Sequence, residues 1–139
     1  AESKYDHPFQ WGSKRTGPDL ARLGGKYPHL WHVRHMEDPR STSPSSIMPA
    51  YPWLLTKEVD LSSTQKKVEA MIMLGVPYGL EEANGATDMA RVQARQIALE
   101  IEEQGGPAGL EDKEIIALIA YMQRLGIDIK REQTQGGQP

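Results

Sequence analysis

Met48 is the residue whose type and setting point most directly to chemistry. It lies in the segment SIMPAYPWL (46–54), where Pro49 and Pro52 restrict the backbone and aromatic side chains follow the thioether. A thioether is a weak, soft ligand that suits haem iron and raises its reduction potential, and a stiff loop helps it to stay bound. The alternative is ordinary packing, because methionine fills irregular gaps in many cores. The spacing alone leaves both interpretations open.

A second rigid feature precedes this loop. The segment RTGPDL (15–20) contains the pair Gly17-Pro18, which predicts a tight corner that fixes the direction of a carbonyl group. A Gly-Pro pair is also a common turn, so by itself it does not establish a site.

Three histidines, His29, His32 and His35, follow one another at three-residue spacing. Neighbouring pairs could share a metal ion, but the outer two drift round the helix. A zinc site also needs ligands from elsewhere. A solvated or partly packed helix face is therefore the favoured interpretation. His7 precedes a proline in a loop and is not expected to bind a metal.

The composition excludes several function classes. The net charge of the 139 residues is −3, with basic and acidic residues interleaved, which disfavours a nucleic-acid partner. Cysteine is absent, so disulfides, thiolate metal sites and a cysteine nucleophile are excluded. The acidic stretches GLEEANG and LEIEEQGG lack a nearby nucleophile pattern and are expected to be solvated. No apolar run reaches the roughly 20 residues of a membrane span.

Periodicity and end signals predict an all-α chain, with about four short helices joined by long Gly/Pro-rich loops. After an irregular start with a short turn at 19–23, the first helix is expected at 29–37 and is stopped by Pro39. The second is expected to follow a capping box formed by Ser62 and Gln65. No strand pattern is present.

Two further helices are expected near the C-terminus. The helix at 88–104 carries an apolar stripe and resembles an insertion, and a clearer helix follows between an Asp112 N-cap and a Gly126 C-cap. The expected buried stripes are Ala90, Ala94, Ile97 and Ile101 on the former, and Ile115, Leu118, Ile119, Met122 and Leu125 on the latter.

Three segments together resemble the monohaem cytochrome c subunit, subunit II, of cbb3-type cytochrome c oxidases. They are YDHPFQWGSKRTGPDLARLGGKY (5–27), WHVRHMEDPR (31–40) and SIMPAYPWL (46–54), and the closing DKEIIALIAYMQRLG resembles the C-terminal helix of c-type cytochromes. The resemblance implies a partial c-type cytochrome fold. It places a cytochrome c-like domain at 1–130, incomplete at its N-terminal side, and a disordered tail at 131–139.

The resemblance also implies a haem site. It places Met48 at the position of the distal ligand, and the Pro18 carbonyl at the position that accepts a hydrogen bond from the proximal imidazole. The remaining assignments that it implies are Trp11, Leu20, Pro49 and Tyr51 lining the haem crevice, Gly17 in the corner before Pro18, Arg15 or Arg40 near a propionate, and Tyr121 where the last helix packs on the domain's first helix.

The family attaches its haem through C-x-x-C-H, and this chain has no cysteine. We therefore expect a fragment that begins after the attachment segment and an N-terminal membrane anchor, and that cannot hold haem c covalently. Exposed crevice residues would then favour self-association of the fragment.

By the same resemblance, the parent protein is an electron-transfer subunit of a terminal respiratory oxidase at the periplasmic face of the bacterial inner membrane. Its haem c would accept single electrons from a cytochrome c-type donor or another cytochrome subunit, and pass them towards the catalytic haem–copper subunit. This is electron relay rather than bond-making catalysis, and the fragment itself is expected to be inactive. The alternative is a haem-free helical module that docks to partner subunits and has no redox activity.

Overall fold

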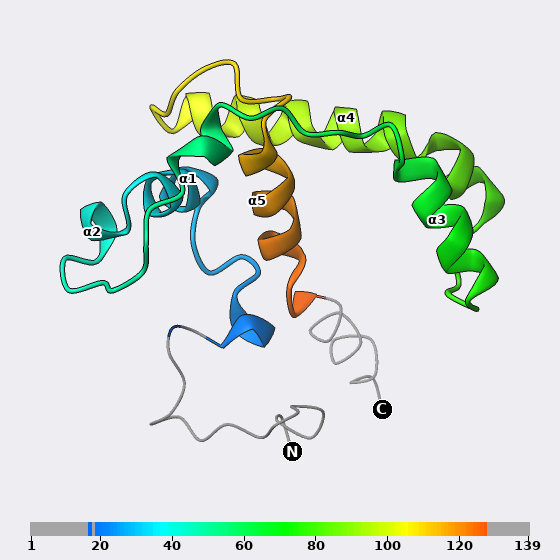
Figure 1. Cartoon of the computed structure of the whole chain (residues 1–139), viewed down its shortest axis with the longest axis horizontal. Coiled ribbons are helices and arrows are strands. Elements are labelled where there is room, and N and C mark those ends of the chain that lie inside the picture. Colours follow the sequence, from blue (N-terminus) through cyan, green and yellow to red (C-terminus); the bar gives the residue numbers. More distant parts are fainter. Residues whose placement is uncertain (1–16, 18, 128–139) are drawn as a thin grey trace, which may run out of the picture. The chain divides into compact units, whose positions relative to one another are not determined.

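The computed structural model describes residue 17 and residues 19–127, which fall into two compact units. One unit comprises residues 1–26 and 122–139, and the other comprises residues 27–121; each is described by itself. Throughout the described residues the regular structure is helical (Figure 1), apart from one isolated bridge between Glu58 and Lys113. The predicted all-α class is confirmed.

The described part of the chain contains five α-helices and two short 3₁₀-helices. In chain order they are η2 (Leu20–Arg22), α1 (His29–Glu37), α2 (Pro39–Thr42), η3 (Pro52–Leu55), α3 (Thr64–Met73), α4 (Leu80–Glu103) and α5 (Glu114–Arg124). The predicted bounds of α1 are correct, and Pro39, expected to stop it, begins α2 after the extended residue Asp38. The predicted turn at 19–23 is the short helix η2, whose first turn is capped by the Asp19 carboxylate.

The start of α1 is fixed by the end of α4. Pro28 occupies the N-cap position of α1 but has no side-chain acceptor. The side-chain carbonyl of Gln104 accepts the hydrogen bond of the Leu30 N–H instead, at 3.0 Å. His29 Nε2 lies 2.9 Å from a carboxylate oxygen of Glu100 on α4. These contacts join two helices that lie far apart in the sequence.

The core of the unit 27–121 is built mainly from aliphatic side chains of α1, α4 and α5. Gly106 allows the close approach of α1 to the end of α4, because an added Cβ would lie 2.7 Å from Leu30 Cδ1 and 2.5 Å from Ile101 Cγ2. The fully or almost fully buried apolar residues here include Leu30, Val33, Ile97, Ile101, Leu110, Ile115, Ile116 and Ile119. The predicted stripes are confirmed at Ile97, Ile101, Ile115, Ile119 and Met122. The other predicted stripe residues, Ala90, Ala94, Leu118 and Leu125, are only half-buried, and Ile116, which was not predicted, is buried.

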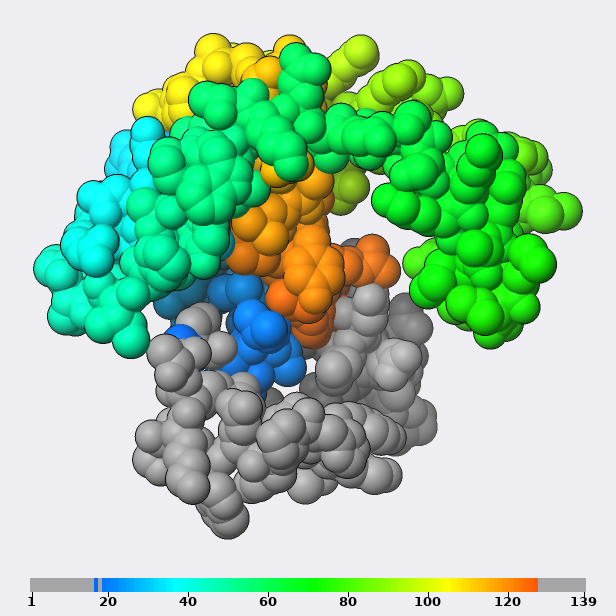
Figure 2. All heavy atoms as spheres, in the orientation of Figure 1, coloured from blue at the N-terminus to red at the C-terminus, as the bar shows by residue number. Residues whose placement is uncertain are grey.

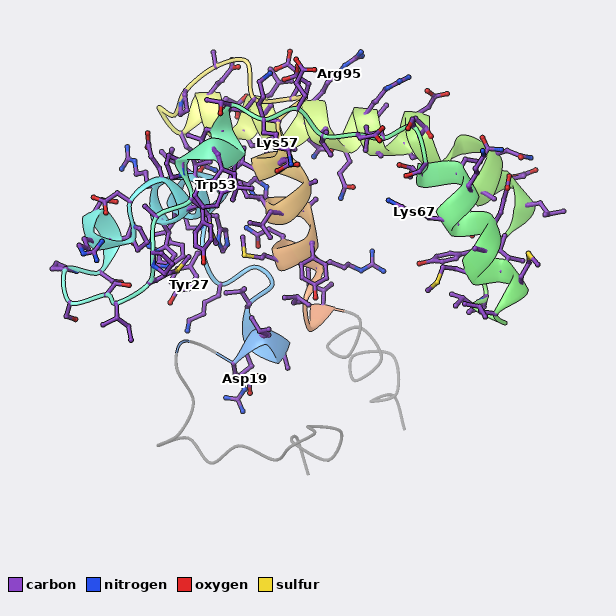
Figure 3. All side chains as sticks on the ribbon, viewed as in Figure 1. Asp19, Tyr27, Trp53, Lys57, Lys67 and Arg95 are labelled. Carbon is purple, nitrogen blue, oxygen red and sulfur yellow. The ribbon has the colours of Figure 1, made fainter. Side chains whose placement is uncertain are left out.

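A short backbone clamp holds the start of α5. The N–H of Val59 donates to the Asp112 carbonyl at 2.8 Å, and the N–H of Glu114 donates to the Lys57 carbonyl at 2.9 Å. Lys57 Nζ also lies 2.8 Å from a Glu114 carboxylate oxygen (Figure 3). Helix α5 begins at Glu114, so the predicted N-cap Asp112 lies one residue too early, and its carboxylate pairs with Lys113 Nζ at 2.9 Å.

The two middle helices form a hairpin in which α3 packs against α4. Helix α4 begins at Leu80, eight residues before the predicted start at Asp88, and it includes the segment EEANGAT. The predicted start is wrong because a local signal was missed: the Glu82 carboxylate caps the Gly79 N–H at 2.6 Å. Ala83 and Ala86 in this early part of α4 are also buried, which the local sequence does not indicate.

The capping box predicted for α3 is also wrong. Ser63 is the N-cap residue and makes no side-chain cap bond. The Ser62 N–H donates to the Asp60 carboxylate at 2.9 Å, which forms an Asx turn before the helix. Gln65 instead donates to Glu69, one helical turn further along α3, at 2.9 Å.

In the other unit, the segment after η2 runs against the end of α5. The N–H of Gly24 donates to the Leu125 carbonyl at 2.9 Å, and the N–H of Gly25 donates to the side chain of Gln123 at 2.9 Å. Gly126, with φ of +79°, ends the helix as predicted. The predicted tail at 131–139 lies outside the described residues and stays a prediction.

Candidate functional site

The Met48 loop is pinned at both of its ends. Before Met48, the Ser46 N–H donates to the Ser43 carbonyl at 2.9 Å, and the Ser46 hydroxyl accepts from the Met48 N–H at 3.2 Å. After it, the Tyr51 N–H donates to the Met36 carbonyl near the end of α1 at 2.7 Å. Met48 itself is half-buried. The loop therefore presents its thioether from a backbone that α1 holds in place.

Two aromatic side chains, Tyr51 and Trp53, follow Met48 in the chain. Tyr51 and Trp53 meet edge to face, with ring centroids 5.1 Å apart. Trp53, whose side chain is labelled in Figure 3, follows the loop. The residue is 51% exposed. Pro49 is exposed, and Tyr51 is half-buried. Pro49 and Tyr51, the predicted lining residues of this unit, and the neighbouring Trp53 are thus only partly covered by the described chain.

A column of three stacked rings begins just before helix α1 and continues along it. Tyr27 stacks on Trp31 at a centroid distance of 4.0 Å, and Trp31 stacks on His35 at 4.5 Å. His35 Nδ1 lies 2.6 Å from the Thr42 hydroxyl oxygen at the end of α2. Trp31 and His35, one helical turn apart on α1, thus stack on each other near the helix end that anchors the Met48 loop.

His32 is the one polar side chain with almost no exposure in the described residues, at 1%. Its ring meets the Trp31 ring edge-on, with centroids 5.3 Å apart, and its Nε2 atom has no hydrogen-bond partner. Burial, together with the smaller effect of the nearby His29 and His35, lowers the pKa of His32 to about 4. The imidazole is therefore neutral at pH 7. The interpretation favoured from the sequence was that the three histidines lie on a solvated or partly packed helix face. It did not predict that His32 is almost fully buried.

We predict that His32 makes the chain less stable in acid. Its pKa is depressed on folding, so between about pH 6.5 and about pH 4 the unfolded chain binds a proton that the folded chain does not. The free energy of unfolding should fall by up to about 3 kcal/mol over that interval. Urea unfolding at about pH 7.5 and about pH 5 should show about 2 kcal/mol of this loss, and the remainder appears on going to about pH 4.

The matched variant is His32→Leu, which removes the titrating group and its unpaired nitrogen. It should flatten most of the pH dependence. A smaller slope is expected to remain, because burial also lowers the pKa of His35. An equal slope in the wild-type chain and the variant would contradict the prediction.

The other predicted site residues belong to a different unit. Gly17 has a φ of +87°, as a glycine corner requires, and it is exposed. Leu20 in η2 is 56% exposed. Trp11, Arg15 and Pro18 lie outside the described residues. Gly17 and Leu20 thus belong to one unit, and Met48, Pro49 and Tyr51 belong to the other.

The remaining candidates fall into ordinary surroundings. Among residues 17 and 19–127, no group of three or more His, Cys, Asp or Glu side chains is placed to hold a metal ion. His7 lies outside this part of the chain. Arg40 and Tyr121 are exposed, and neither the propionate contact nor the helix packing predicted for them is tested by the described contacts.

The comparison with known families matches almost the whole chain. Residues 1–129 match the family described as cytochrome c oxidase, mono-heme subunit, FixO. The chain belongs to this family. No curated protein matches the chain. Membership of the FixO family confirms the resemblance to the monohaem subunit of cbb3-type oxidases, which is an electron-transfer component of a membrane-bound oxidase complex.

FixO membership also defines the cofactor class. The family carries haem c in general, and this chain has no cysteine among its 139 residues, so it cannot form the thioether bonds of covalent attachment. Within the described residues, no helix has both the length and the apolar character needed to cross a bilayer. The donor set of the Met48 loop fits a haem: a soft thioether on an anchored backbone, beside apolar and aromatic surface.

Proposed function

We propose that Met48 would supply a thioether ligand to haem c in this subunit, and that the subunit relays single electrons towards the oxygen-reducing haem–copper subunit of its oxidase. The observation that carries the proposal is the anchored loop. Its half-buried thioether is held between the Ser46 turn and the hydrogen bond from Tyr51 to Met36. A weak ligand needs such a backbone, because little entropy is then lost when it binds.

The chain's own residues would tune and protect the redox centre. Haem c supplies a one-electron couple when it is bound. Met48 would favour the reduced state, because a thioether donates weakly to ferric iron. Tyr51, Pro49 and Leu20 would exclude water from the crevice. By family resemblance, the Pro18 carbonyl would orient the proximal imidazole, Trp11 would line the crevice, and Arg15 or Arg40 would lie near a propionate.

The same proposal assigns the redox partners and the location. A cytochrome c-type donor, or another cytochrome subunit, would deliver electrons at the periplasmic face of the inner membrane. The catalytic haem–copper subunit would receive them. FixO membership supports this assignment, because a subunit of an oxidase complex acts beside other subunits.

The experiment that tests the proposal is Met48→Ala in a haem-bearing form, in which a C-x-x-C-H segment precedes the chain. Loss of the thioether should abolish the weak charge-transfer absorption band that methionine-ligated ferric haem shows at long wavelength. Met73→Ala is the matched control, because Met73 is exposed at the end of α3 and should leave the band intact. A band that survives Met48→Ala would refute the axial role.

The second candidate function is the haem-free docking module. The absence of cysteine favours it for the 139 residues themselves. The visible absorption spectrum of the purified chain separates the two, since a covalently attached haem would rule this candidate out. We also still expect the isolated chain to self-associate through its exposed crevice residues.

A further inference from the structure

The end of the α3–α4 hairpin carries an unusual apolar surface. We define the hairpin end as residues 70–80, AMIMLGVPYGL, a stretch without a charged side chain. It includes three highly exposed large apolar residues: Met73 at 87%, Leu74 at 79% and Leu80 at 75%. The hairpin is the green part of the chain on the right in Figures 1 and 2. Large apolar residues that are highly exposed and grouped at one turn of the chain are typical of interaction sites.

Hydrogen bonds fix the backbone of the hairpin end. Helix α3 closes with the two hydrogen bonds of a Schellman motif, from Gly75 N–H to the Ile72 carbonyl at 2.9 Å and from Val76 N–H to the Met71 carbonyl at 3.0 Å. Gly75 has the positive φ, +86°, that this motif needs. The Glu82 carboxylate caps the start of α4 through the Gly79 N–H. The exposed side chains are therefore presented on an ordered backbone, which lowers the entropy lost on binding.

The charges around the hairpin end are all of one sign. Between Lys67 and Arg91 the sequence has no basic residue, and its charged side chains are Glu69, Glu81, Glu82 and Asp88. Asp88 forms an ion pair with Arg91 at 3.5 Å, so Glu69, Glu81 and Glu82 are the carboxylates that border the hairpin end. Two copies meeting end to end would bring these carboxylates together, which costs free energy. An anionic membrane surface requires Lys or Arg beside the apolar residues, and here there is none.

We propose that the hairpin end docks into an apolar depression bordered by Lys or Arg on another subunit of the oxidase. Membership of the FixO family places the chain among such subunits. The carboxylates around the hairpin end call for Lys or Arg at the border of the partner's depression, and the exposed Met and Leu side chains call for an apolar centre in it. This role is separate from the proposed haem ligation, because no residue of the hairpin end belongs to the Met48 loop.

The test measures binding of the 139-residue chain to purified oxidase that was assembled without this subunit. The variant Leu74→Glu/Leu80→Glu should weaken the affinity at least about tenfold, because two carboxylates would have to be buried in the apolar depression. The matched control is Leu99→Glu, an exposed leucine on α4 outside the hairpin end, which should change the affinity less than about twofold. Far-UV circular dichroism confirms that each variant remains helical.

A charge variant tests the basic border independently. Glu81→Lys should weaken binding several-fold and reduce its dependence on salt, because it places a cation against Lys or Arg. Unchanged affinity in both Leu74→Glu/Leu80→Glu and Glu81→Lys would overturn the proposal. Two other results would overturn it as well: a dimer of the chain that only the leucine variant abolishes, or binding to phosphatidylcholine or phosphatidylglycerol vesicles that this variant abolishes.

Discussion

Replacing Met48 by histidine in the haem-bearing form is expected to lower the reduction potential of the subunit substantially. An imidazole donates more strongly to iron than a thioether, so it stabilises the ferric state relative to the ferrous state. The loop is anchored by the hydrogen bond from Tyr51 to Met36, so the new side chain should be presented from the same backbone. A spectroelectrochemical titration of the haem measures the shift.

Met73→His is the control for this titration, because it adds the same imidazole at an exposed position of the hairpin end. It should leave the potential unchanged. If Met48→His left the potential unchanged too, Met48 would not be a ligand of the iron. The docking proposal would remain intact in that case, since it is tested by binding alone.

Gly126→Ala is expected to cause the largest loss of stability of any single methyl addition at the described glycines. A Cβ at this position would overlap the carbonyl oxygen of Ala21, and the φ of +79° is itself unfavourable for alanine. Backbone must move to relieve such an overlap, so we expect a loss of more than about 3 kcal/mol in the unit that contains both residues. Faster hydrogen exchange of the Gly24 amide, which donates to Leu125, is the measurement that reports on this unit.

Gly25→Ala separates the overlap from the backbone strain. Gly25 also has a positive φ, +72°, but an added Cβ would meet nothing within 4 Å. The variant should therefore lose only about 1 kcal/mol, the cost of the left-handed conformation. Equal effects of Gly126→Ala and Gly25→Ala would show that the contact with Ala21 does not form in solution.

The parts of the fold that follow local rules could be predicted from the sequence. Helix α1 lies between Pro28 and Pro39, and its predicted bounds match those of the structure. The apolar stripe of α5 and the glycine that ends it were likewise readable from spacing and residue type. The early start of α4 was missed, although Gly79 and Glu82 form a recognisable cap, because Asn84 and Gly85 suggested a loop.

Other features depend on contacts between segments distant in the sequence. Nothing near Pro28 indicates that Gln104 supplies the missing cap of α1. The burial of His32 likewise depends on packing around α1, and a histidine in a polar-looking helix carries no signal of it. For the candidate site, the sequence indicated Met48 as the important residue, but the anchoring of its loop to Met36 required the structure.

Helix α4 has a mechanical consequence for electron transfer. Its 24 residues make a rod about 36 Å long, with the hairpin end at one extremity and the contacts to His29 and Leu30 at the other. Helix α1 in turn anchors the Met48 loop through Met36. A subunit seated by the hairpin end would thus hold the thioether at a set separation from the surface on which it is docked. The rate of electron tunnelling falls steeply with the distance between redox centres. Helix α4 would therefore influence the electron-transfer rate through a docking surface that lies far from the haem iron.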